Sequence, residues 1–498
     1  MKVLLEMRPA LDGHAGIPQE TRLLFRGLAK LDGVEVEGLI QSSTLVLAKG
    51  LPTTLPGRFS LRRALPLDKQ INRLSRVVVS LIHSVKPSRV ERVVYAVQVT
   101  LATVMLLAKT LLGMRQPLSR FDPTRFRDFI WRSLFAKTLP YEDFESVTHR
   151  NFRIAQVPWM VMHVTALITR KFGHALYPKL DTRGFDLMIA ETPYPGTVLS
   201  GTRMVVRYHD AIPLLMPHTI SDRSYHQASH YNALRRNIED GAWFACVSEA
   251  TRRDLIEIFP QAEARSLTIY NMVSHHYFAE DSPADRIPDI IRTRKNTSVK
   301  MPSGTSIRGL DHPAGGLPLQ YLLMVSTIEP RKNHLTLLAA WEQLRNGEFP
   351  NLHLVFVGSL GWDHKGIVKK LRPWLTRGGL HMLEDVPSGE LRQLYRHASV
   401  TVCPSFGEGF DFSGVEAMRC GGVVAASDIP VHREVYGEAS EYFSPYSAGE
   451  LAQAVRKMAS AGAEPRREEL RQLGAGMCAR YLPERILPEW AAFLAKMS

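Results

Sequence analysis

Short hydrophobic runs alternate with longer amphipathic stretches over most of this chain. Residues 1–6 and 185–190, 204–208 and 242–247 form one set of runs, and 321–325, 352–357 and 400–403 form a second. Runs of this length predict strands buried on both faces of a parallel sheet. Between them lie amphipathic stretches such as 19–30, and the chain closes with a predicted helix at 483–497. The alternation predicts an α/β fold with two doubly wound, Rossmann-like domains facing a cleft.

The spacing of these runs also predicts domain boundaries. A chain of 498 residues is too long for a single compact core. Residues 281–317 are polar, rich in Pro, Gly, Ser and basic residues, and without periodicity, which predicts a linker or loop. We therefore expect an N-terminal domain at 1–280, a second domain at 318–475 and a C-terminal helix at 476–498.

Residues 51–180 interrupt the first domain with a segment rich in arginine and aliphatic residues. Two stretches in it lack charge, 93–108 and 154–169, but the second contains Pro158 and His163. A membrane-spanning helix needs about 20 apolar residues, so both stretches are borderline. Strands before and after the segment must share one sheet, which requires an even number of crossings. The pattern favours helices that pack on the domain or lie in the membrane interface over two spans.

The positive charge of the chain is concentrated in the same segment. Between Arg58 and Lys137 there are 16 Lys and Arg against 4 Asp and Glu, which accounts for +12 of a net charge of +13. Basic residues interleaved with apolar runs such as 77–82 favour an anionic membrane surface over nucleic acid, and no nucleic-acid-binding motif accompanies them. The alternative is a segment that only packs against the N-terminal domain.

Cysteine usage and the first residues predict the compartment. Cys246, Cys403, Cys420 and Cys478 are far apart, which argues against a zinc site or a disulfide framework and for a reducing environment. The start of the chain is too short and too soon charged for a signal peptide, and predicts a buried strand instead. We expect a cytoplasmic protein, peripheral at the inner face of the cytoplasmic membrane.

The stretch 404–422 is the most informative for chemistry. Seven residues separate Glu408 from Glu416, and a glycine-containing loop leads into a helix that begins near Ser413. The N-terminus of a helix offers free N–H groups and a positive dipole end to a phosphate. The alternatives are a capping box, in which Glu416 only completes the helix start at Ser413, and an ordinary solvated loop carboxylate at Glu408.

A second motif, at 326–334, follows a predicted buried strand and precedes a helix. It places Arg331 and Lys332 at the carboxyl end of that strand, where doubly wound sheets bind ligands. The alternative is a basic helix start, which the helix dipole disfavours. These two cations are suited to hold a departing diphosphate. No Asp-x-Asp sequence occurs, so no metal and no cofactor is expected.

Together the two motifs resemble glycosyltransferase family 4, the retaining glycosyltransferases of GT-B fold that include bacterial mannosyltransferases and sucrose synthase. The family's Glu-x7-Glu motif is matched from Glu408 through Glu416 to the Ala-Met-Arg-Cys-Gly run that ends at Gly421. Its Glu-Pro-Arg-Lys-Asn motif is matched by 329–333. The resemblance covers about 1–45 and 180–480 and leaves 51–180 outside as a basic, helical insertion.

The resemblance implies roles for the matching residues. Glu408 lies near the reacting sugar, and Glu416 binds the ribose hydroxyls of the donor. Arg331 and Lys332 grip its diphosphate. His209 matches a histidine at the edge of the sugar site, although a histidine after a strand is by itself more often a structural hydrogen-bonding group.

The resemblance implies further donor-binding positions in the N-terminal loop that contains Gly16 and around the helix start near Ser413. They are Gly16, which lets the backbone approach the donor phosphate and acceptor, Val386 near the nucleobase, and Phe410, Asp411, Phe412 and Ser413.

Several positions depart from the family pattern. Ser326-Thr327 replaces a usual Gly-Arg, Asp411-Phe412-Ser413 replaces Gly-Leu-Pro, and Pro18 stands where a glycine is common.

The resemblance implies retention of anomeric configuration by front-face attack, with a nucleotide sugar as donor. The sequence of residues 327–333 resembles that of bacterial mannosyltransferases, which favours GDP-mannose as the donor. Donors that carry rhamnose, glucose or galactose remain as alternatives. The insertion favours a glycan or lipid-linked acceptor at the membrane, in bacterial surface polysaccharide biosynthesis. Two other readings remain: an epimerase or phosphorylase of the same fold, and an inactive membrane-bound scaffold that has kept it.

Overall fold

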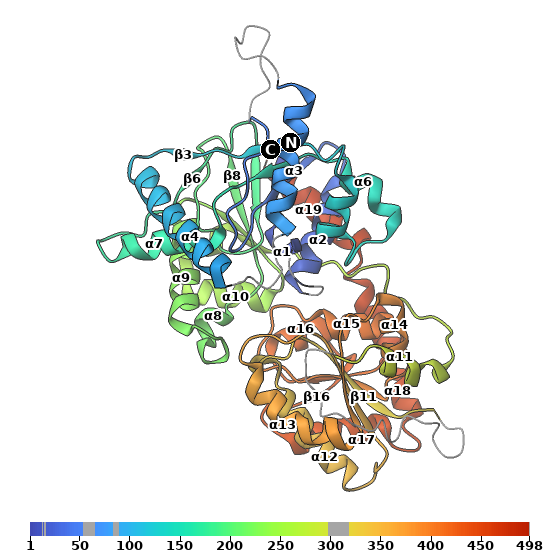
Figure 1. Ribbon diagram of the computed structural model, residues 1–498. Helices are drawn as coiled ribbons and strands as arrows, with labels where there is room; N and C mark the ends of the chain where they lie inside the picture. The colour runs from blue at the N-terminus through green and yellow to red at the C-terminus, as the bar shows by residue number, and fades with distance from the viewer. Residues whose placement is uncertain (12, 14–15, 53–64, 83–88, 297–317, 498) are drawn as a thin grey trace.

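The computed structural model describes residues 1–498 except 12, 14–15, 53–64, 83–88, 297–317 and 498. The chain forms two lobes, each built around a mostly parallel sheet covered by helices (Figure 1). The fold predicted from the hydrophobic pattern is confirmed.

The first lobe contains an eight-stranded sheet in the order β10-β9-β8-β7-β1-β2-β5-β4. The strands pair in parallel except β4, which runs antiparallel to β5. Their bounds are β1 Lys2–Glu6, β2 Glu35–Ile40, β4 Ser119–Phe121, β5 Phe152–Ile154, β7 Leu187–Ala190, β8 Arg203–Tyr208, β9 Trp243–Cys246 and β10 Ser266–Thr268. The strand order reverses between β1 and β7, so a topological switch point lies there.

The second lobe contains a six-stranded, wholly parallel sheet in the order β13-β12-β11-β14-β15-β16. Its strands are β11 Tyr321–Val325, β12 His353–Val357, β13 Leu380–Leu383, β14 Val400–Cys403, β15 Val424–Ser427 and β16 Ser440–Phe443. The order reverses between β11 and β14, which again marks a ligand-binding position at the carboxyl ends of the strands. The segments after these two strands carry the two sequence motifs.

The helices alternate with these strands and cover both faces of each sheet. In the first lobe they are α1 Arg8–Leu11, α2 Ile17–Lys30, α3 Leu67–Ile82, α4 Arg89–Leu111, α5 Arg127–Ile130, α6 Phe144–Thr148, α7 Trp159–Arg170, α8 Ile212–Leu215, α9 Arg223–Glu239 and α10 Glu249–Ile258. In the second they are α11 Ile287–Thr293, α12 His334–Arg345, α13 His364–Arg377, α14 Ser388–His397, α15 Phe412–Arg419, α16 Pro430–Tyr436, α17 Ala448–Ala459 and α18 Glu464–Ala479.

The last helix, α19 Pro483–Lys496, returns to the first lobe (Figure 1). Ile486, Trp490 and Phe493 are buried in the same cluster as residues of β1 and α2. The C-terminal helix therefore completes the core of the N-terminal domain.

Part of the predicted linker is folded. Residues 284–293 form a short 3-10 turn and α11, because Ile287, Ile290 and Ile291 are buried in the core of the second lobe. The expectation of a linker at 281–317 is wrong for these residues, and 297–317 lie outside the described residues.

The insertion at 51–180 supplies α3 to α7 together with strands β4 and β5, which extend the first sheet. The 12-residue α7 is too short to span a bilayer. Among the described residues, one helix is long and apolar enough to do so, over Val94–Leu111 of α4, with a mean hydropathy of 1.6. Because β2 and β5 pair in one sheet on either side of α4, a single crossing is incompatible with this topology.

Candidate active site

The loop after β14 brings Glu408 to the boundary between the two lobes. A Cβ on Gly409 would lie 1.7 Å from the carbonyl oxygen of His209, so only glycine permits this approach. The hydroxyl of Ser248 donates to the Gly409 carbonyl at 2.7 Å, and Ser248 also caps α10, as predicted. The motif loop of the second lobe therefore rests directly on the first lobe.

Glu408 is ion-paired with both predicted phosphate-binding cations. Arg331 Nη1 lies 2.6 Å and Lys332 Nζ 2.5 Å from the two carboxylate oxygens. Burial favours the neutral acid, but the two cations outweigh it and lower the pKa of Glu408. Arg331 also donates to the Gly407 carbonyl and to Glu329. Burial disfavours its charge, but Glu408, Glu329 and Asp210 outweigh burial and raise the pKa of Arg331. Glu408 and Arg331 are therefore both charged at neutral pH.

Glu416 binds groups from both lobes. Gln19 Nε2 of α2 donates to one carboxylate oxygen at 2.9 Å, and the Tyr395 hydroxyl donates to the other at 3.1 Å. The capping-box alternative is wrong, because α15 is capped by Asp411, whose side chain accepts from the Ser413 N–H. Burial raises the pKa of Glu416 to about 7, against these two hydrogen bonds.

Asp411 occupies the start of α15 and turns its carboxylate back onto the protein. Besides the Ser413 N–H and hydroxyl, it contacts Nε2 of His432 at 3.2 Å. Burial disfavours its charge, but His432 and Lys332 more than compensate and hold the pKa of Asp411 well below its usual range. One N–H of this helix end is thus already occupied by a side chain of the protein.

His209 follows β8 and contacts a carboxyl group that the sequence did not single out. Its Nε2 lies 3.2 Å from Glu191 Oε2, after β7. Burial, assisted by Arg207, lowers the pKa of His209 to about 4, and burial raises the pKa of Glu191 to about 8. Both groups are therefore mainly uncharged at neutral pH, and they form a neutral hydrogen bond beside the charged Glu408 cluster.

Beneath His209 the first lobe buries an ion pair, between Arg207 and Glu20, with both side chains fully buried. Arg207 also donates to the carbonyls of Ile269 and Tyr270 and to Asn271. Arg207 is on β8, two residues before His209, so this network helps to fix the position of the histidine.

The remaining predicted positions lie at the edges of this site or in the core. Gly16 has φ +71° directly before α2, a conformation that favours glycine. The rings of Phe410 and Phe412 are buried in the second core, with Phe410 packed edge-on against Tyr481. Val386 lies after β13, half-buried against the same core.

Sequence reasoning missed Gln19, Tyr395 and Glu191. Each touches a predicted site residue from another element of the fold, and Gln19 does so from 397 residues away in the chain. The loop position of Glu191 after a buried strand was the only available signal. Within the described parts of the chain, no group of three or more metal-ligating side chains occurs.

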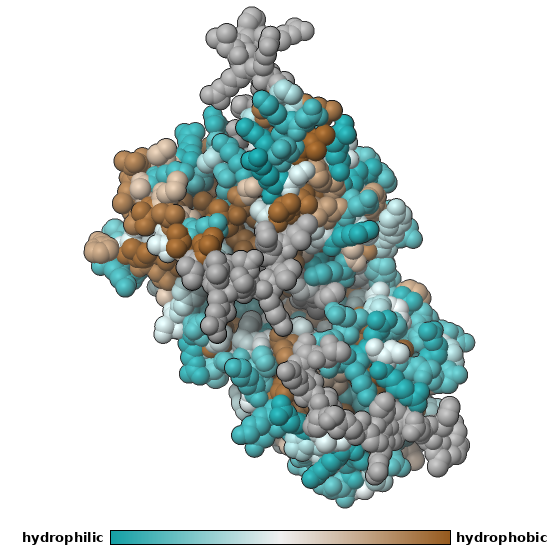
Figure 2. All heavy atoms as spheres, in the orientation of Figure 1, coloured by the Kyte–Doolittle hydropathy of each residue, from teal (hydrophilic) through white to brown (hydrophobic). Residues whose placement is uncertain are grey.

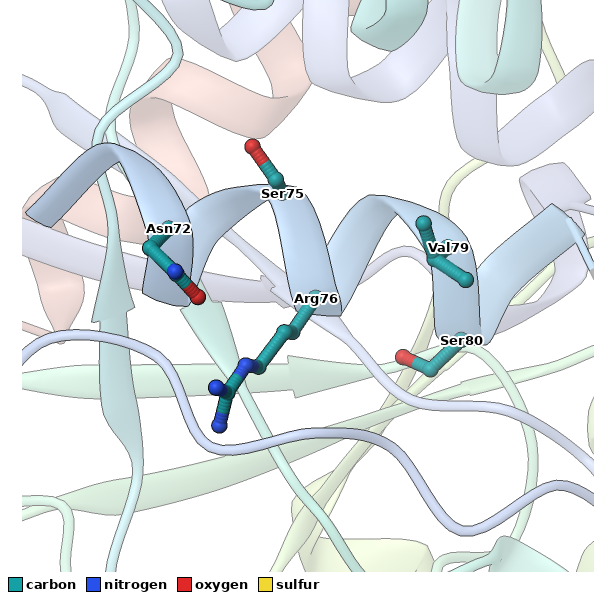
Figure 3. A pocket seen from close by; sticks show the side chains of 5 residues that line it. All are labelled: Asn72, Ser75, Arg76, Val79 and Ser80. Atoms are coloured by element: carbon teal, nitrogen blue, oxygen red, sulfur yellow. The ribbon is translucent and has the colours of Figure 1, made fainter. Parts of the chain in front are cut away.

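A shallow hollow of about 450 Å³ lies elsewhere, against α3 (Figure 3). Its lining comes from one face of that helix: Asn72, Ser75, Arg76, Val79 and Ser80. It includes none of the predicted site residues.

The second lobe matches a known family. Residues 317–475 match the family model for group 1 glycosyl transferases. This range contains Arg331, Lys332, Glu408 and Glu416. The match identifies an enzyme domain of glycosyltransferase type in the second half of the chain.

Individual relatives share parts of the chain. The serotype-specific mannosyltransferase WbdA of Escherichia coli is 35% identical over 166 residues, which cover 32% of this chain and 20% of that protein. The O-antigen chain mannosyltransferase B of Escherichia coli is 26% identical over 247 residues, covering 49% of this chain and 58% of that protein. The matches therefore span about a fifth of one relative and somewhat over half of the other.

The whole fold has a solved counterpart. Sucrose-phosphate synthase from Thermosynechococcus elongatus superimposes with a TM-score of 0.59 at 15% identity, over 100% of this chain and 98% of that one. The two-lobed architecture is the GT-B fold.

Proposed function

We propose that this protein is a retaining mannosyltransferase, which transfers mannose from GDP-mannose to a membrane-associated glycan or lipid-linked acceptor in bacterial surface polysaccharide biosynthesis. The observation that carries the proposal is the contact of Glu408 with Arg331 and Lys332, directly against the His209 end of β8. The partial identity to the two mannosyltransferases supports mannose as the sugar.

In the proposed mechanism the donor diphosphate takes the place of Glu408 as the partner of Arg331 and Lys332. Negative charge grows on the leaving phosphate as the glycosidic bond breaks, and two cations in a buried site stabilise it. The acceptor hydroxyl attacks from the same face, and its proton passes to the leaving phosphate oxygen. Glu408, released from the cations, positions and stabilises the oxocarbenium-like sugar.

Glu416 and His209 complete the site in this proposal. Glu416 accepts hydrogen bonds from the ribose hydroxyls in place of Gln19. His209 is held neutral, so its imidazole can hydrogen-bond the sugar without adding charge. No metal and no cofactor takes part in the mechanism.

Release of nucleotide from GDP-mannose tests the proposal. We expect the protein to release GDP when a lipid extract of bacterial membranes is added, and to form an α-mannosyl product by NMR. Glu408→Gln should lower the turnover by about 10²–10³, the cost typical of losing one electrostatic stabiliser. Glu438→Gln, at an exposed carboxylate after α16, serves as the matched control.

Each alternative gives a different result in this assay. Turnover of UDP-glucose in place of GDP-mannose would contradict the donor. Conversion of the nucleotide sugar without acceptor would indicate an epimerase or phosphorylase. Tight GDP-mannose binding with no turnover under any condition would indicate an inactive scaffold that has kept the fold.

A further inference from the structure

An apolar pocket lies under α4, at the carboxyl edge of the first sheet. It encloses about 190 Å³ and is lined by the inner face of α4 and by the segments after β2 and β5. Leu106, Ala155 and Met162 contribute apolar walls that are buried. A small apolar cavity of this kind suits part of a hydrocarbon chain.

One polar group in the lining lacks a partner. Gln116 is only 7% exposed, and its Nε2 has no hydrogen-bond partner among the described residues. A buried donor of this kind costs free energy until an acceptor reaches it. A hydrocarbon alone cannot supply that acceptor, so the arrangement favours a ligand that carries oxygen next to an aliphatic chain.

Cations flank the pocket. Lys109 belongs to its lining, and the exposed Arg115 and Lys179 are paired residues of the short ladder β3 Arg115–Gln116 and β6 Lys179–Leu180. None of the three forms a salt bridge with a described residue. Asp181 interacts electrostatically with Arg115, and Asp240 does so with Lys179. Both carboxylates already form ion pairs, Asp181 with Arg183 and Asp240 with Arg236. This charge suits a phosphate head group.

A hydrogen bond links the pocket to the segment that carries Glu191. Gln41 lines the pocket and accepts a hydrogen bond from the Tyr194 hydroxyl at 2.9 Å. Tyr194 follows Glu191, the partner of His209, by three residues. A ligand seated under α4 therefore lies along the sheet edge that leads to His209.

We propose that this pocket binds the first part of the aliphatic tail of a lipid-phosphate-linked acceptor. The phosphate lies against Lys109, Arg115 and Lys179, and an oxygen next to the tail accepts from Gln116. The inference rests on the proposed function, because it names what holds the acceptor for transfer. It commits to the acceptor's own tail and not to a bilayer phospholipid.

Calorimetry with dodecyl phosphate below its micelle concentration tests the site directly. The wild-type protein should bind it saturably, one molecule per chain. Ala102→Phe, which fills the pocket from α4, should weaken binding at least tenfold, and Gln116→Leu should weaken it about three- to tenfold. Val104→Phe is the matched control, because Val104 lies on the same helix with its side chain 60% exposed. It should bind dodecyl phosphate as the wild type does.

Two outcomes would overturn the inference. Binding that does not saturate, or that Val104→Phe strengthens while Ala102→Phe leaves it unchanged, indicates adsorption to the surface of α4. Loss of binding to phosphatidylglycerol vesicles in Ala102→Phe, equal to its loss of dodecyl phosphate binding, indicates a bilayer lipid as the occupant.

Release of GDP from GDP-mannose separates this inference from the proposed function. Ala102→Phe should bind GDP with an affinity within about twofold of the wild type by calorimetry, which also shows that it is folded. If the wild-type protein binds dodecyl phosphate in the pocket but never uses GDP-mannose, the donor proposal fails and the lipid site stands. If the wild-type protein uses GDP-mannose but does not bind dodecyl phosphate, only the lipid site fails.

Discussion

Glu408 carries a buried charge that side chains of the protein compensate. Its carboxylate satisfies Arg331 and Lys332, the two cations that the motif predicts for a diphosphate. Removing one member of such a buried pair leaves the other charge uncompensated, which is costly. In the proposed mechanism a diphosphate, with more charge than one carboxylate, replaces Glu408 at the cations and leaves it free to face the sugar.

Glu416 shows most clearly which contacts of a single residue a sequence pattern cannot specify. The spacing from Ser413 fits both a capping box and a ligand-binding carboxylate. The structure excludes the capping box, because Asp411 caps the helix and Glu416 instead bonds to Gln19, 397 residues away in the chain, and to Tyr395. No local pattern specifies such a contact, because it depends on how the two lobes meet.

The raised pKa of Glu416 predicts a pH-dependent stability. A carboxyl group with a pKa of about 7 in the folded protein and 4.5 in the unfolded chain favours folding most below pH 4.5. That contribution is lost as the pH rises from 4.5 through 7. Between pH 4.5 and 8, Glu416→Gln should therefore gain on the order of 3 kcal/mol in unfolding free energy relative to the wild type.

Denaturant titrations at several pH values measure this difference. Tyr395→Phe is the companion variant, because it removes a hydrogen bond to the carboxylate and should move the decline to higher pH. Parallel stability curves for the wild type and Glu416→Gln from pH 4.5 to 8 would refute the raised pKa.

At the scale of whole elements, strong periodicity was a reliable guide and weak periodicity was not. The six predicted strands from 185 to 403 formed because their apolar runs are buried on both faces. Helix α11 was missed because three isoleucines in a polar stretch form a pattern too short to stand out. Its burial comes from the second core, which the sequence of the segment does not show.

The helix α4 carries an exposed apolar stripe on the outside of the first lobe (Figure 2). Val97, Leu101 and Val104 recur at helical spacing with 53%, 57% and 60% of their surfaces exposed. Exposed apolar residues gathered on one helix face in a basic segment favour adsorption to an anionic membrane.

Flotation with liposomes tests this surface. We expect the protein to float with phosphatidylglycerol vesicles and to remain largely in the bottom fraction with phosphatidylcholine alone. Val97→Ser combined with Leu101→Ser should reduce the floated fraction several-fold, because it removes apolar area that inserts at the interface. Ser75→Ala on α3 is the control. Equal flotation of the double variant and the wild type would mean that α4 does not contact the bilayer.

At the scale of the molecule, the end of the chain stabilises its beginning. The sequence predicted α19 but not its place, since an amphipathic helix can pack on either domain. Trp490 is fully buried in the first core, and its ring lies 5.4 Å from the guanidinium of Arg207. Arg207 pairs with Glu20 beneath His209, so α19 supports the first-lobe half of the site from the opposite end of the sequence.

Trp490→Ala should therefore destabilise the N-terminal domain and not only the last helix. Loss of a buried tryptophan costs about 3–5 kcal/mol, and hydrogen exchange should become faster in β1 and α2 as well as in α19. Leu473→Ala on α18, where the side chain is 40% exposed, is the control and should leave exchange in β1 unchanged. Faster exchange confined to 483–497 would mean that the two ends fold independently. Faster exchange in β1, α2 and β8 together would show that the first lobe, its closing helix and the strand that precedes His209 unfold as one unit.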